Sequence, residues 1–196
     1  MSTGCKKKSI FQTISVAIIM LMLAFGVIKM YQNVNRQTEK QEKKLTEVES
    51  ILAKDLKKEY PASPREVVKM YLRIMTAFYN EELDEETFYE LSNKARELFD
   101  EELLENNPSE TYFEKLKDEI SKYHENEIKV DSYDVQEGSA IRKYKREGKQ
   151  YALVIAKVVT RDSKVRSSVN EKFVLRENQD GNYKILGWKE TKDALE

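Results

Sequence analysis

The sequence predicts a small α+β domain carried by one N-terminal transmembrane helix. Three patterns lead to this fold class: an uncharged hydrophobic run over 10–28, helical spacing of apolar residues from Ser63 to Tyr123, and alternating spacing from Ile128 onward. The chain has 196 residues, of which 40% are hydrophobic and 35% charged. This length and composition suit one domain with accessory segments.

Residues 10–30 are predicted to form a transmembrane signal anchor behind a cytoplasmic tail, 1–9. The uncharged run is about long enough to cross a hydrocarbon core of ~30 Å as a helix. Three lysines precede it and favour a cytoplasmic N-terminus and an extracytoplasmic domain at the cell membrane. A cleaved signal peptide is the alternative, because Ala24 and Gly26 have cleavage-site spacing. We favour an uncleaved anchor, since the apolar run continues to Ile28.

Residues 31–62 are predicted to form a helical juxtamembrane stalk. The stretch is rich in Glu, Lys, Gln and Leu, which are good helix formers, and has no Gly or Pro before Pro61. A narrow apolar stripe indicates either a coiled-coil dimer or a stalk end that packs on its own domain. We favour packing, because the stripe lasts less than two heptads. The stripe consists of Leu45, Val48, Leu52 and Leu56.

The folded domain is predicted to span 63–191, before a tail at 192–196, and to begin with three helices. Ser63, Pro64 and Glu66 form a capping-box pattern. Asp84 is expected to cap a second helix, and Asn107-Pro108 repeats the cap-and-proline signal for a third. The expected core positions are Val67, Val68, Tyr71, Ile74, Met75 and Phe78, then Phe88, Leu91, Ala95, Leu98 and Phe99, then Phe113, Leu116, Ile120 and Tyr123.

Strands are predicted to follow from Ile128 as an antiparallel sheet, with the helices packed on one face. The run 151–160 is the strongest, because it is apolar and β-branched. A hairpin-type turn is expected at 178–181, where Gly181 allows positive φ. One further strand is predicted to begin at 128–130. The others are predicted over 139–146, 165–176 and 182–190.

The last predicted strand, with Asp180-Gly181 followed by Tyr183, Ile185 and Trp188, resembles the ending of many nuclear transport factor 2-like (cystatin-like) domains. The likeness covers about 63–191. The whole layout also resembles small, membrane-anchored bacterial proteins that carry such a domain. The resemblance implies a cone whose sheet and helices enclose a pocket, and members include enzymes, ligand binders and interaction modules. Fold alone does not choose between these functions.

No catalytic constellation is recognisable, so we expect no enzyme, no cofactor and no metal site. The lone His124 ends a polar helix, where a solvated side chain is the ordinary interpretation, and Cys5 is the lone cysteine. Nucleotide-binding glycine motifs do not occur, and the acidic excess beyond Met30 disfavours nucleic-acid binding. Tyr71, Tyr112 and Tyr151 are candidates to line the cone pocket, although we favour core packing with a satisfied hydroxyl.

A basic run marks one candidate surface for an anionic partner. Arg142, Lys143, Lys145 and Arg146 flank Tyr144 in a predicted hairpin. Charges of this kind also protect an edge strand from pairing with other chains.

Three functional hypotheses follow, in order of preference. The first is a membrane-anchored, non-catalytic interaction module or accessory subunit of an envelope-associated complex, with a protein partner or self-association. The second is an extracytoplasmic small-ligand-binding or sensory domain that uses the cone pocket, and the third is a small-molecule enzyme. A cone plugged by aromatic and Met side chains excludes the last two, whereas a roomy cone with a buried carboxylate favours them.

Overall fold

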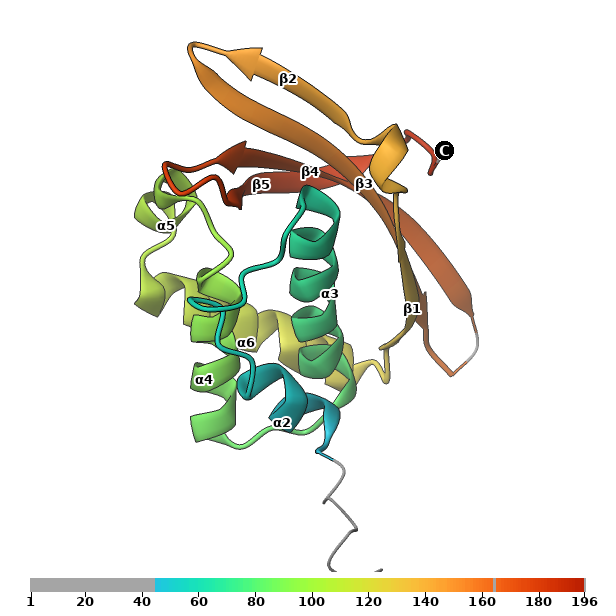
Figure 1. Ribbon diagram of the computed structural model, residues 1–196. Helices are drawn as coiled ribbons and strands as arrows, with labels where there is room; N and C mark the ends of the chain where they lie inside the picture. Colours follow the sequence, from blue (N-terminus) through green and yellow to red (C-terminus); the bar gives the residue numbers. More distant parts are fainter. Residues whose placement is uncertain (1–44, 164, 196) are drawn as a thin grey trace, which may run out of the picture. The chain divides into compact units, whose positions relative to one another are not determined.

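Five α-helices precede five β-strands along residues 45–163 and 165–195, the part of the chain that the computed structural model describes. The strands form one curved antiparallel sheet, and the helices lie on one side of it (Figure 1). The predicted α+β class and the one-sided helix layer are therefore confirmed. The predicted tail at 1–9, the anchor at 10–30 and the first part of the stalk lie outside the described residues. Among the helices within them, none has the length and apolarity needed to cross a membrane.

The compact unit begins at Leu45, eighteen residues before the predicted boundary at Ser63. The end of the predicted stalk forms one short helix, α2 (Glu47–Leu52), and then turns. Thr46 and Glu49 cap α2 with a complete capping box. Of the apolar stripe, Val48 and Leu56 are buried in the core and Leu45 is exposed. The described part of the stalk therefore packs against its own domain, as favoured above.

Helix α3 (Pro64–Asn80) runs through the middle of the helix layer, and all six of its expected core residues are buried. Pro64 occupies the first turn, and Ser63 Oγ accepts a hydrogen bond from Glu66 N at 3.3 Å. The structure describes this half of the predicted capping box, while the Glu66 carboxylate pairs with Lys69 and Arg65. Each fully buried aliphatic or aromatic side chain here contributes about 1.5–3 kcal/mol.

The remaining helices are α4 (Glu85–Arg96), α5 (Glu101–Asn106) and α6 (Ser109–Glu125). Asp84 caps α4 as predicted, accepting from Thr87 N at 2.8 Å. The sequence analysis missed α5, which buries no side chain and so has no apolar period to detect. The cap predicted at Asn107 is wrong: Pro108 is the N-cap residue of α6 and offers no side-chain oxygen.

The strands of the sheet are β1 (Lys129–Val135), β2 (Arg142–Arg146), β3 (Lys149–Arg161), β4 (Arg166–Glu177) and β5 (Tyr183–Thr191). Its order is β1-β3-β4-β5, with β2 paired to the first half of β3 and β1 to the second. The turns at Gly148 and Gly181 have φ values of +80° and +79°, which glycine adopts without strain. Residues 98–100 pair in parallel with β5 through Ile185 and cover that edge.

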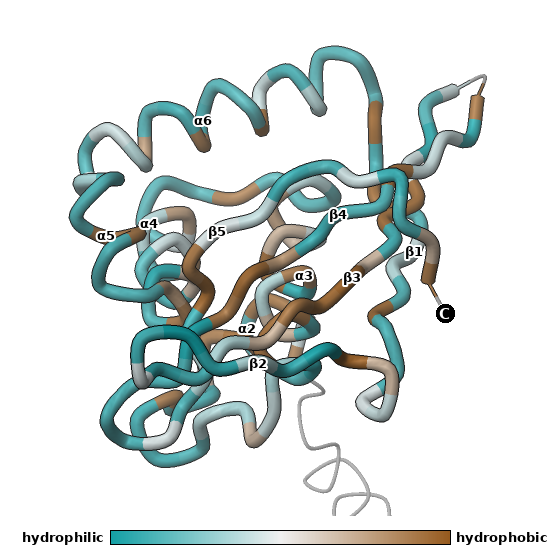
Figure 2. Tube along the Cα trace, turned by 90° about the horizontal axis from the view of Figure 1, so that it is seen from above, coloured by the Kyte–Doolittle hydropathy of each residue, from teal (hydrophilic) through white to brown (hydrophobic). Residues whose placement is uncertain are grey.

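The core lies between α3 and the inner face of the sheet, where side chains of alternate strand residues meet the helices. Ala152, Val154 and Ala156 of β3 are fully buried, as are Phe173 and Leu175 of β4. Viewed from above, the middle of β3 and β4 is hydrophobic, whereas α6 is largely hydrophilic with hydrophobic positions recurring along it (Figure 2). Among α6 side chains, Leu116 is buried, and Phe113, Ile120 and Tyr123 pack partly buried against the core. Because few of its side chains are buried, α6 does not fill the space beneath the sheet completely.

Candidate functional site

A partly enclosed cavity of about 130 Å³ lies between the inner face of the sheet and helices α3 and α6. Its size is close to that of an engineered apolar cavity that admits benzene, about 150 Å³. The wall combines apolar, aromatic and acidic side chains: Tyr71, Leu72, Met75, Thr76, Tyr79, Glu119, Tyr123, Val130, Tyr133, Val158, Thr160, Val169, Glu171 and Trp188.

Glu171 is an acidic residue on the inner face of the sheet. It lies on β4 between Val169 and Phe173 in the two-residue period of that face, and it pairs across the ladder with Ala156 and Glu190. Burial and the nearby Glu119 and Glu190 raise the pKa of Glu171 to about 7. No cation or hydrogen-bond donor among the described side chains neutralises this carboxyl group.

Glu119 lies on α6 at the rim of the cavity, where it is exposed. Tyr79 Oη on α3 donates a hydrogen bond of 2.6 Å to Glu119 Oε1. The Tyr79 and Tyr123 rings stack with centroids 4.1 Å apart, so a phenol pair bridges α3 and α6. Burial, and then the negative charge of Glu119, raise the pKa of both phenols, which keeps them protonated donors at neutral pH.

A second group of aromatic side chains lies around Tyr71 and Trp188. The Tyr71 ring lies 5.0 Å from the ring of Trp188, the lone tryptophan of the chain, and both pack against Phe173. Burial raises the pKa of Tyr71 well above its ordinary value. Among the described cations, none lies over the rings of Tyr71, Tyr79, Tyr123 or Trp188, whereas Lys184, for example, lies over Tyr60.

The ends of α3 and β1 are fixed by a single side chain. Asn80 Nδ2 donates to Val130 O and Asn80 Oδ1 accepts from Val130 N, both at 2.8 Å. This pair of bonds holds Val130, a lining residue, against the end of α3.

Of the three predicted pocket residues, Tyr71 lines the cavity and the other two lie elsewhere. Tyr112 packs edge-on against Phe99 at 5.6 Å, with its buried hydroxyl lacking a partner in the described residues. Tyr151 stacks on Tyr144 between β3 and β2, with centroids 5.2 Å apart. Both therefore serve packing, which was the alternative interpretation.

The predicted basic surface lies on β2, the edge strand beside the first half of β3. Its four basic residues are exposed, but strand alternation sends Lys143 and Lys145 to one face and Arg142 and Arg146 to the other. Lys143 Nζ lies 5.3 Å from the Tyr183 ring, and Arg146 pairs with Glu147. The structure does not bring the four charges together on one face.

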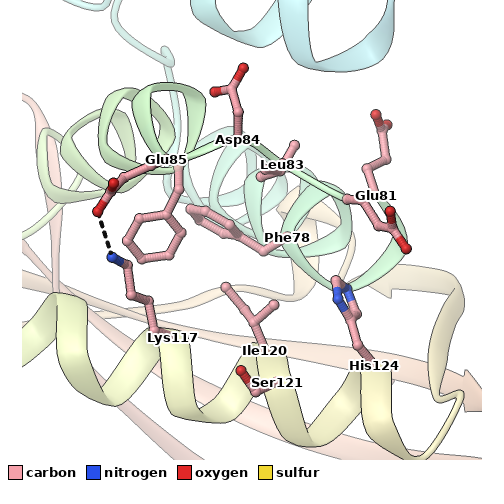
Figure 3. Close-up of a pocket in the computed structure, with 11 residues that line it drawn as sticks. Phe78, Glu81, Leu83, Asp84, Glu85, Lys117, Ile120, Ser121 and His124 are labelled. Carbon is pink, nitrogen blue, oxygen red and sulfur yellow. Dashed lines mark hydrogen bonds and ion pairs between the residues drawn. The ribbon is translucent and has the colours of Figure 1, made fainter.

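His124 lines a different and more open hollow, of about 420 Å³, between the end of α3, the start of α4 and α6. Figure 3 shows Phe78 at its base and the imidazole of His124 projecting from the same helix as Lys117 and Ile120. Lys117 pairs with Glu85 at 3.3 Å and also lies over the Tyr89 ring. Because its cation is already engaged and its walls are open to solvent, this groove is the weaker candidate.

Sequence reasoning missed Glu171, Glu119, Tyr79 and Trp188 as cavity residues. A signal for Glu171 was present, because it shares the two-residue period of Val169, Phe173 and Leu175. A carboxylate on an apolar strand face is unusual and indicates either a partner or a function.

A protein-family model described as "Domain of unknown function (DUF6715)" matches residues 1–188. The chain belongs to this family. The match includes every lining residue of the cavity and ends before Glu190. No curated protein matches the chain.

Proposed function

We propose that this domain is a small-ligand-binding module that uses the cavity beneath its sheet, held at the cell membrane by the predicted anchor with the domain outside the cell. The observation that carries the proposal is the convergence of Glu171, Tyr79 and Trp188 on one partly enclosed cavity. A concave, mainly apolar site with a few placed polar groups is the ordinary form of a ligand pocket. This was the second hypothesis from the sequence, and a cavity with a half-buried carboxyl group is the feature that favours it.

Binding is a better account of this cavity than catalysis. Its described lining offers carboxyl groups, phenols and two threonines, but no His, Cys or Lys. A carboxyl group that titrates near neutral pH suits proton transfer, yet the described lining gives no second group with a matched role. The Thr76 hydroxyl is already committed to Leu72 O at 2.8 Å.

The nuclear transport factor 2-like fold is part of the same proposal. Support comes from the order of the elements, with helices before strands, and from the curved sheet covered on one face. In this fold the cavity occupies the interior of the cone, where the resemblance implies a pocket.

The experiment is a binding screen on full-length protein in a non-ionic detergent. Cationic, neutral and anionic molecules of up to about eight non-hydrogen atoms are tested by thermal shift and by emission of Trp188, which lines the cavity. We expect at least one class to raise the melting temperature and to change the emission saturably. Val169→Phe fills the cavity and should abolish both responses.

The matched control is Ser168→Phe, which adds the same ring one residue away on the opposite sheet face. It should bind as the unmodified protein does. If circular dichroism shows that Val169→Phe is unfolded, Thr160→Leu, a smaller change in the same wall, replaces it. A protein that responds to no class of molecule, or a Val169→Phe variant that responds normally, contradicts the proposal.

The interaction-module hypothesis stays a prediction, and one observation favours it. Among the described residues, no helix lies on the outer face of the sheet, and Leu153, Ile155 and Val174 on it are partly exposed. Crosslinking of tagged full-length protein in native membranes, followed by gentle purification and mass spectrometry, tests this idea. A stoichiometric envelope partner would support it, and recovery of the protein alone would count against it.

A further inference from the structure

The cavity lacks one class of side chain that is common elsewhere in the domain. Among the fourteen lining residues there is no Lys or Arg, although Glu171 and Glu119 both line it. Glu190 lies beside Glu171 in the neighbouring strand and adds a third carboxyl group. The cavity is therefore a region of negative potential, which repels anions and attracts cations.

Several acidic side chains elsewhere in the domain have a basic partner. Asp100 is buried and pairs with Arg176, Glu47 pairs with Arg73, and Asp131 pairs with Arg166. Glu171 breaks this pattern among the described residues, because its nearest charged neighbours are acids. Like charges placed opposite each other across a ladder destabilise a sheet. A cation held between them would remove that cost.

The aromatic side chains that line the cavity, together called the aromatic wall, suit the same kind of ligand. Tyr71, Tyr79, Tyr123 and Trp188 all line the cavity, and none of the described cations lies over their rings. Aromatic cages with a nearby carboxylate are a general way to bind ammonium groups, because the ring quadrupole attracts positive charge. A hydrated metal ion instead requires oxygen ligands, which aromatic rings do not supply. The described residues also contain no group of three or more His, Cys, Asp or Glu placed to hold a metal.

We propose that the cavity binds a small organic monocation, a primary or methylated ammonium group, between Glu171, Glu119 and the aromatic wall. This inference rests on the proposed function and names its ligand class. The volume of about 130 Å³ limits the buried part of the ligand to roughly that of a benzene-sized group. The ammonium nitrogen lies near the carboxyl groups, and its alkyl or methyl groups contact the rings.

Binding is coupled to protons because the cation favours the ionised form of Glu171. The groups that face this carboxyl are Glu119 and Tyr123 from α6, Glu190 from β5, and Tyr71 and Tyr79 from α3. The phenols keep their protons at neutral pH, so the carboxyl groups carry the pH response. With the pKa of Glu171 about 7, affinity should fall about fivefold from pH 7 to pH 6 and level off above pH 8.

The test uses n-butylammonium and tetramethylammonium as probes, with n-butanol and butyrate as neutral and anionic counterparts of similar size. Full-length protein in non-ionic detergent is titrated at low ionic strength, with matched sodium chloride additions subtracted. Trp188 emission and calorimetry are the readouts. We expect saturable binding of the two ammonium ions, at least about tenfold weaker binding of butanol, and none of butyrate. Near pH 7, calorimetry in buffers of different ionisation enthalpy should detect proton release.

Glu171→Gln should weaken ammonium binding on the order of tenfold, the loss of one charge-assisted contact. The matched control is Glu114→Gln, the same change at an exposed position of α6. It should leave the affinity unchanged. Because glutamine keeps the shape of the side chain, the comparison separates loss of charge from loss of packing.

The outcomes distinguish the ligand class from the proposed function. If butanol or butyrate binds in a manner that Val169→Phe blocks, and the ammonium ions do not, the cavity is a ligand site and the cation inference is overturned. If calcium or magnesium chloride alone gives the response and Glu171→Gln removes it, the site binds metal and the inference is again overturned. If nothing binds, the proposed function fails as well.

Discussion

Glu171 makes a prediction about stability that is independent of any ligand. Its pKa is about 7 in the folded chain and 4.5 ordinarily, so the folded state binds a proton that the unfolded state has released between these pH values. The free energy of unfolding should therefore fall as pH rises through this window, by up to about 3 kcal/mol, and level off above pH 7. Glutamine at position 171 does not titrate. The stability difference between Glu171→Gln and the unmodified protein should grow from pH 5 to pH 8, as measured by urea unfolding.

Glu114→Gln provides the control, because it makes the same change at an exposed position of α6. Parallel stability curves for the unmodified protein and Glu171→Gln would mean that residue 171 titrates normally. The carboxyl group would then be better solvated than its surroundings imply.

Single residues also set the limit of what the sequence could predict. Glu171 is spaced two residues from Val169 and Phe173, so it faces the same side of the sheet as they do. A charged residue in a strand is usually expected on the solvent side, and its place in the cavity was therefore not predicted. The bond from Tyr79 to Glu119 could not be predicted, because it joins residues 40 positions apart and depends on how α6 lies on α3. Tyr71 lines the cavity, although its helical core period favoured simple core packing.

At the scale of elements, the junction of α3 with β1 depends on Asn80. Asn80→Ala removes both hydrogen bonds to Val130 and leaves the buried backbone N–H and C=O of that residue unpaired. We expect a loss of about 2–3 kcal/mol in the free energy of unfolding, because unmet buried polar groups cost more than an average bond contributes. Equilibrium denaturation in urea measures the loss.

Asn126→Ala is the matched control for the junction. Asn126 ends α6 and makes one exposed bond to Lys122 O, so its loss should cost well under 1 kcal/mol. Equal losses for the two variants would show that α3 and β1 are held by packing alone. This junction could not be predicted from the sequence, because it joins residues 50 positions apart in the chain.

Within the described residues, elements predicted from strong patterns were found, and an element without a pattern was missed. Strand β3 stood out through its β-branched run and lies in the middle of the sheet. Helix α5 has no buried side chain and depends on its Asp100 cap and on the chain direction set by the pairing of 98–100 with β5. A helix that is fixed by tertiary contacts leaves no periodic signal in its own residues.

For the whole molecule, the layering predicts a gradient of local stability. Strand β3 is paired on both sides and buries Val154 and Ala156 completely, whereas β2 and α5 bury no residue. Hydrogen exchange measured by mass spectrometry should be slowest in the middle of β3 and β4 and fastest in α5 and β2. Equal hydrogen-exchange protection of α5 and β3 would contradict this order. It would mean that α5 packs more tightly than its exposed side chains indicate.

The covered edge of the sheet has a consequence for many copies crowded at one surface. Strand edges with free backbone groups recruit further strands and allow sheets to grow into fibres. Here residues 98–100 occupy the outer side of β5, and the opposite edge is interrupted between β1 and β2 by the turn Gly138–Ala140 and carries the charges of β2. The edge of β5 is thus occupied at Ile185 and the β2 edge is charged, so these two stretches are poor templates for an incoming strand.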